Sequence, residues 1–75
     1  MAKLTGTVVE VHPFHAFALV EHGDNSYRYF LYSTAFSPIG RWSWADVTEG
    51  TTVRFTPIVH PKGDRGIEVE ILDPG

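Results

Sequence analysis

The sequence predicts a small all-β protein that folds as a five-stranded Greek-key barrel. Five short stretches are rich in β-branched and aromatic residues, which favour strands. Residue types that favour turns, mainly glycine, proline, asparagine and aspartate, lie between them. At 75 residues the chain has room for one small core, so we expect a single domain over residues 1–75.

The first three strands are expected to form an antiparallel meander. The first is predicted over Leu4–His12, which has no helical spacing of apolar residues and ends before Pro13, a residue without an N–H to donate. The second is predicted over residues 14–21, close enough to the first for a hairpin. A dense turn signal at 22–26 leads to the third strand, Tyr27–Tyr32.

The rest of the chain adds one long connection and two strands. Residues 33–36 are expected to form one helical turn, and the connection over 39–50 is long for a compact domain. Strands are predicted over 51–59 and 67–72, joined by a charged hairpin loop. Five strands with a long connection after the third is the layout of the OB-fold, which binds oligonucleotides on its second and third strands.

The second and third strands are apolar on both faces, whereas a half-buried strand is apolar on alternate residues only. One face is assigned to the core with Ala16, Ala18, Val20, Tyr29 and Leu31. The fifth strand is expected to add Ile67, Val69 and Ile71 to that core. The other face is expected to point outward with Phe17, Leu19, Phe30 and Tyr32. Exposed apolar surface of this kind marks several types of interface.

Composition limits the classes of function. The formal net charge of −3 argues against a protein that binds nucleic acid mainly through phosphates, but it leaves room for base stacking. The absence of cysteine excludes disulfides and cysteine-based zinc sites and fits a reducing compartment. The first residues lack the apolar run of a signal peptide, and no stretch approaches the roughly 20 apolar residues of a membrane span. We therefore expect a cytoplasmic protein without membrane attachment.

The residue types that carry catalysis or bind metals form no convincing constellation. One pair of the four histidines, His12 and His15, has the spacing His-x-x-His, but Pro13 intervenes and residues three apart on a strand point to opposite faces. The chain has no glycine-rich phosphate loop, serine nucleophile motif or convincing carboxylate pair, and Glu68 and Glu70 are expected to lie on a solvated strand face. We expect neither an enzyme nor a bound cofactor or metal.

Five short motifs occur at defined spacings along the chain. They are Gly6-Thr7-Val8, the segments 15–20 and 29–33, Glu49-Gly50-x-x-Val53-x-Phe55, and Lys62-Gly63. In these motifs the chain resembles the cold-shock domain, a nucleic-acid-binding OB-fold of bacterial cold-shock proteins and eukaryotic Y-box proteins. The resemblance covers nearly the whole chain and implies binding of single-stranded RNA or DNA.

The resemblance also implies where bases stack. The family's stacking positions are occupied here by Phe17, Phe30 and Tyr32, which keep an aromatic ring. Three other positions depart from the pattern, because Leu19 and Ser33 replace phenylalanines and Glu10 falls where the family carries a tryptophan. The departures predict weaker binding than is usual for the family.

Further contacts are expected at the edges of this face. Arg28 shares the outward parity of Phe30 and is a candidate for a phosphate or base contact. His15 falls at a lysine position of the family, and Lys62, with Arg65, lies in the charged hairpin loop. Trp42 and Trp44 are expected to divide two roles, one closing the barrel end and the other, Trp44, contacting the ligand.

The sequence is also compatible with a second class of function, a protein-interaction module. The acidic balance, Glu10 and the Leu19 replacement favour an OB-fold module that has lost nucleic-acid binding. Such a module would use the exposed sheet face for a protein partner or for a symmetric homodimer.

Overall fold

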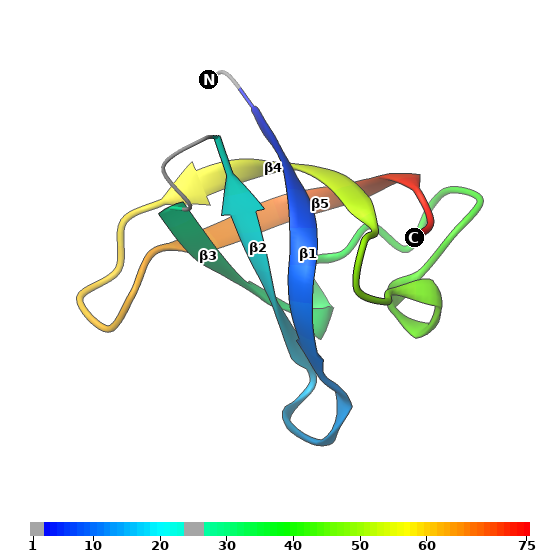
Figure 1. Ribbon diagram of the computed structural model, residues 1–75, viewed down its shortest axis with the longest axis horizontal. Coiled ribbons are helices and arrows are strands. Elements are labelled where there is room, and N and C mark those ends of the chain that lie inside the picture. The colour runs from blue at the N-terminus through cyan, green and yellow to red at the C-terminus, as the bar shows by residue number, and fades with distance from the viewer. Residues whose placement is uncertain (1–2, 24–26) are drawn as a thin grey trace.

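The computed structural model describes residues 3–23 and 27–75 of the chain. Its five strands close into a barrel in the order β1-β2-β3-β5-β4 (Figure 1), which confirms the predicted all-β barrel of OB-fold type. The strands are β1 (Leu4–His12), β2 (Phe17–His22), β3 (Tyr27–Tyr32), β4 (Thr52–Ile58) and β5 (Arg65–Asp73).

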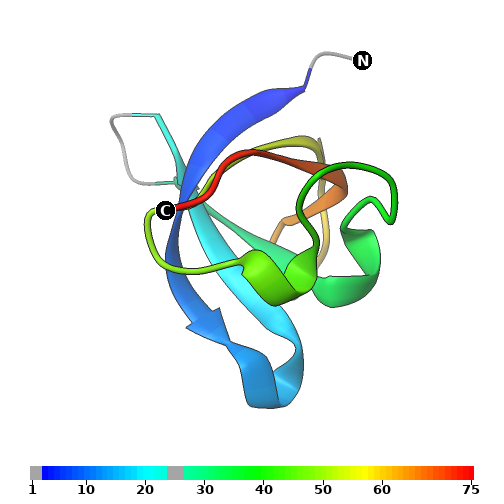
Figure 2. The same ribbon diagram turned by 90° about the vertical axis from the view of Figure 1, so that its right-hand side faces the viewer.

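The strands form two layers, with β4 and β5 crossing behind β1–β3 in Figure 1. β1, β2 and β3 pair as the predicted antiparallel meander, and β4 pairs antiparallel with both β1 and β5. β3 and β5 close the barrel in parallel, at Phe30 and Arg65. Because parallel neighbours need a crossover, the long connection after β3 passes over one end of the barrel (Figure 2).

The turn between β1 and β2 differs from the prediction that the second strand begins at residue 14. Pro13–His15 forms a single 3-10 turn, since proline pre-sets the φ angle that such a turn requires. Ala16 closes the turn in the left-handed conformation, with φ 57°, and its N–H donates to the Pro13 carbonyl. Ala16 is therefore a turn residue, and its prediction as a core residue is wrong. Phe14 stands at the tip of the hairpin, 96% exposed.

The core lies between the two layers and contains most of the residues predicted for it. The fully or nearly fully buried apolar side chains are Val8, Ala18, Val20, Leu31, Val53, Phe55 and Val69. Burying each of the larger ones stabilises the fold by about 1.5–3 kcal/mol. Tyr29 is half-buried with its ring 5.1 Å from that of Phe55, and Ile71 also packs against this core.

The start of β5 breaks the predicted alternation. Glu68 has a positive φ of 52°, and the register with β4 shifts between Arg54 and Thr56. Ile67 is consequently 36% exposed rather than inward, while Gly66 takes the buried place beside Leu31. A Cβ at Gly66 would overlap the Leu31 side chain, so only a glycine fits there without repacking.

Candidate nucleic-acid interface

The outer face of β1–β3 presents three rows of side chains across the strands. The pairing register sets the rows as His12–Phe17–Tyr32, Glu10–Leu19–Phe30 and Thr7–Glu21–Arg28. A register shift between Val8 and Glu10 turns Glu10 onto the same face as Thr7. The first two rows are mainly aromatic and apolar, and the third is charged.

Phe17, Phe30 and Tyr32 form a contiguous aromatic cluster on this face. The ring centroid of Phe17 lies 5.7 Å from that of Phe30, edge to face, and 5.9 Å from that of Tyr32. Tyr32 is 38% exposed, and the two phenylalanines are half-buried. The structure thus brings together the three residues that the sequence predicted to stack bases.

Two histidines extend the aromatic cluster toward the β1–β2 turn. The His12 ring stacks on Phe17, with centroids 4.7 Å apart and an interplanar angle of 17°. Sequence reasoning considered His12 only as a metal ligand, although its parity with Glu10 placed it on the outer face. The predicted contact residue His15 lies at the cluster's edge, 6.4 Å from Phe17 between centroids.

Arg28 lies on the predicted face, but two carboxylates engage its guanidinium. Its Nη1 donates to Glu10 Oε2 at 3.1 Å, and its Nε donates to Glu21 Oε2 at 3.1 Å. Glu10 also forms a 3.1 Å hydrogen bond with His12 Nε2. The sequence position of Arg28 suggested a free positive charge for a phosphate. In the structure, two carboxylates neutralise that charge.

Arg65 supplies a cation beside the aromatic cluster. Its guanidinium carbon lies 4.8 Å from the ring centroid of Tyr32, within cation–π range. Among the described residues no ion pair includes Arg65, and its Nε is buried without a hydrogen-bond partner. The parallel pairing of β5 with β3 at Phe30 places this side chain beside the aromatic cluster.

The loop between β4 and β5 is held against β3 beside the aromatic cluster. Tyr27 donates its hydroxyl to the Asp64 carboxylate, and the Asp64 carbonyl accepts the Phe30 N–H at 2.9 Å. The hydrogen bond to Asp64, and then its negative charge, raise the pKa of the Tyr27 phenol. Gly63 touches the Phe30 ring so closely that a Cβ would lie 2.7 Å from it. Lys62, a predicted contact, is exposed next to this glycine.

Trp44 does not join the aromatic cluster. It begins the 3-10 turn η3 (Trp44–Asp46), and its ring lies 5.3 Å from that of Phe36. Phe36 belongs to the buried core, and Trp44 packs against that core. The turn η3 is part of the long connection, which covers one end of the barrel (Figure 2). Trp44 is the tryptophan that was expected to contact the ligand, so its packing against the core differs from the role predicted for it. Trp42 is half-buried, with the Arg41 guanidinium 5.3 Å from its ring centroid.

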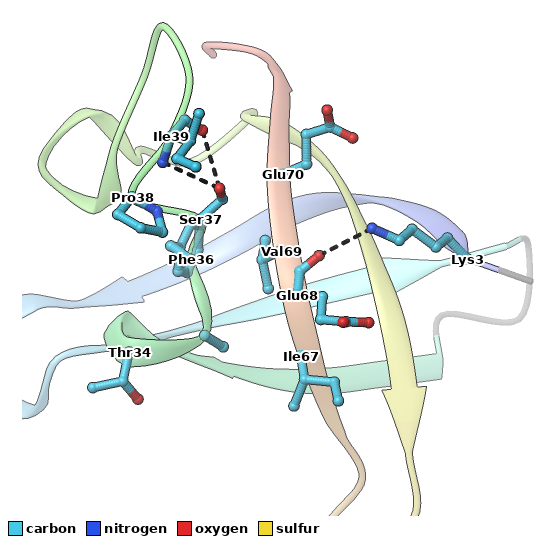
Figure 3. Close-up of a pocket in the computed structure, with 11 residues that line it drawn as sticks. Lys3, Thr34, Phe36, Ser37, Pro38, Ile39, Ile67, Glu68, Val69 and Glu70 are labelled. Carbon is cyan, nitrogen blue, oxygen red and sulfur yellow. Dashed lines mark hydrogen bonds between the residues drawn. The ribbon is translucent and has the colours of Figure 1, made fainter. Parts of the chain in front are cut away.

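A groove of about 640 Å³ lies elsewhere, between β5 and the segment that follows β3 (Figure 3). Its walls include Phe36, Ile39 and Ile67, and Lys3 Nζ approaches the Glu68 carbonyl at 3.5 Å on one side. None of the aromatic cluster residues lines this groove.

The described part of the chain contains no group of three or more side chains arranged to hold a metal ion. In the same ranges, no helix is long and apolar enough to cross a membrane. A comparison with models of known protein families and with curated proteins finds no match for this chain. Membership of the cold-shock family therefore stays a hypothesis based on the motifs.

Proposed function

We propose that this protein is a non-enzymatic, cytoplasmic binder of single-stranded RNA or DNA that holds bases by stacking. The observation that carries the proposal is the aromatic cluster of Phe17, Phe30 and Tyr32 on the outer face of β2 and β3. Aromatic side chains on this face are the means by which OB-folds hold single strands, at about 1–3 kcal/mol per stacked base.

The two sides of the aromatic cluster differ in charge. Arg65 and Lys62 lie on the side of the β4–β5 loop, whereas Glu10 and Glu21 lie on the β1 side with Arg28 between them. A strand bound here places its phosphates toward Arg65 and Lys62. Its bases then cross the aromatic cluster toward β1.

The test is a titration of the isotope-labelled protein with a six-nucleotide oligothymidine and a six-nucleotide oligouridine, followed by backbone amide NMR shifts. We expect saturable shifts concentrated at residues 15–19, 30–32 and 63–65. Tryptophan fluorescence is a poor reporter, because Trp44 packs against the core and Trp42 contacts Arg41 rather than the aromatic cluster. Shifts confined to the groove of Figure 3, or no shifts at low salt, would contradict the proposal.

The ion pairs of Arg28 favour a second candidate, a module that binds protein or a second copy of itself. With its guanidinium neutralised, part of the outer face resembles an ordinary protein contact surface with an apolar centre and charged rim. Sedimentation equilibrium of the free protein separates the candidates. A dimer that a Phe30→Glu substitution abolishes would support the second, and a monomer at all concentrations would remove its dimeric form.

A further inference from the structure

The Glu10 carboxylate is held on the outer face beside the aromatic cluster. Its Oε1 bonds to His12 Nε2 and its Oε2 to Arg28 Nη1, each at 3.1 Å. His12 in turn stacks on Phe17. In the register, Glu10 pairs with Leu19, whose other neighbour is Phe30. The His12 ring therefore connects the Glu10 carboxylate to Phe17, one of the rings on which bases are proposed to stack.

Glu10 keeps hydrogen-bonding capacity for a ligand. An ionised carboxylate only accepts, and each of its oxygens takes up to two hydrogen bonds. His12 and Arg28 use one position on each oxygen, and the Glu10 side chain is 44% exposed. Each oxygen can therefore accept one further hydrogen bond, so the partly exposed carboxylate has two acceptor positions left for a ligand.

The charges at this position favour a base edge over a phosphate. Two carboxylates, Glu10 and Glu21, share the single guanidinium of Arg28, so these three side chains together keep one negative charge. A phosphate is repelled there, while N–H donors are attracted. The positive side, at Arg65, lies across the aromatic cluster.

Among the bases, guanine has the matching edge. Its Watson–Crick edge carries two neighbouring donors, the N1–H and the N2 amino group, which fit two carboxylate oxygens with parallel hydrogen bonds. Adenine and cytosine each place a ring nitrogen acceptor beside their amino group, and the N3–H of thymine and uracil lies between two carbonyls. Single-stranded bases expose this edge for recognition, and charge-assisted paired hydrogen bonds are strong.

We propose that Glu10 reads bases on this face and selects guanine in a bound single strand. The proposal rests on the proposed function, since it requires a strand on the aromatic cluster. It adds a base preference, set by a residue that departs from the tryptophan of the cold-shock pattern.

The test compares affinities by anisotropy competition, using hexathymidine and three variants with one central guanine, inosine or adenine. We expect the guanine oligonucleotide to bind about tenfold more tightly than hexathymidine. Inosine keeps the N1–H but lacks the amino group, so it should lose most of that gain, and adenine should bind like thymine. Glu10→Gln, which puts a donor where an acceptor is needed, should remove the guanine preference while hexathymidine still binds.

Glu21→Gln is the matched control, because Glu21 holds the same arginine but lies in the row farther from His12 and Phe17. It should keep the preference. Equal affinities of the wild type for all four oligonucleotides, or a preference that survives Glu10→Gln, would overturn the role of Glu10 and leave the stacking proposal standing. Absence of binding to every oligonucleotide would overturn both.

Discussion

The Arg65 guanidinium lies over the ring of Tyr32, with its central carbon 4.8 Å from the ring centroid. Arg65 begins β5 and Tyr32 ends β3, so the parallel closure of the barrel creates this contact. The contact fixes a positive charge at the edge of the aromatic cluster. It gives an acidic protein a local positive charge on the outer face of the barrel.

Arg65→Met should weaken binding of a labelled hexathymidine by about tenfold, because it removes the charge and keeps an apolar stem over Tyr32. Arg54→Met is the matched control. Arg54 lies on β4 in an ion pair with Glu70, 2.6 Å apart, away from the aromatic cluster. Anisotropy titrations should show unchanged affinity for the Arg54 variant. Equal losses in both variants would mean that total charge, and not this contact, determines affinity.

Binding should depend only weakly on salt. With Lys62 and Arg65 as the two phosphate contacts, the logarithm of the affinity should fall with the logarithm of salt concentration with a slope of about −1.4. Isothermal or anisotropy titrations at several salt concentrations measure this slope. A slope steeper than about −3 would require more phosphate contacts than these two residues provide.

The hydrogen bond from Tyr27 to Asp64 should make stability depend on alkaline pH. The pKa of Tyr27 is raised in the folded protein because the phenol donates to Asp64 beside a negative charge, and it returns to its ordinary value on unfolding. The stabilisation is therefore fully present below the ordinary tyrosine pKa and is lost as pH rises through the raised one. Urea unfolding of the wild type and Tyr27→Phe should show a difference at neutral pH that closes above that range. A difference that is constant with pH would refute the assignment.

Leu31 and Leu72 should differ in their contribution to the free energy of unfolding, because only Leu31 is buried in the core. Leu31→Ala should lower the free energy of unfolding by about 2–5 kcal/mol, since Leu31 is fully buried and its removal leaves a cavity. Leu72→Ala, at a position 38% exposed, should change it by about 0.5 kcal/mol or less. Urea denaturation monitored by circular dichroism gives both values. Similar losses for the two leucines would contradict the arrangement of the core.

The fold was largely predictable from strand composition and turn residues. β1 and β3 have the predicted bounds, and Ala18, Val20 and Leu31 are buried as expected. Two local conformations were not predictable from alternation. The left-handed Ala16 shortens β2 at its start, and the positive φ of Glu68 moves Ile67 outward. Both depend on backbone torsions that a period-two pattern does not encode.

The aromatic cluster was predictable because it depends on parity within two strands. The charges around it depend on pairing between strands, which the sequence does not show. The ion pairs of Arg28 need the register of β1, β2 and β3, and the position of Arg65 needs the parallel contact of β3 with β5. The placement of Trp44 depends on how the long connection covers the barrel end.

The most direct test of the central claim is the affinity of the double variant Phe17→Leu/Phe30→Leu for labelled hexathymidine and hexauridine. Leucine keeps the apolar packing and removes the stacking faces, so the account predicts at least about a tenfold loss for both strands. Phe14→Leu, which changes a 96% exposed ring outside the aromatic cluster, should bind within about twofold of the wild type. A double variant that binds both strands as tightly as the wild type would contradict the account.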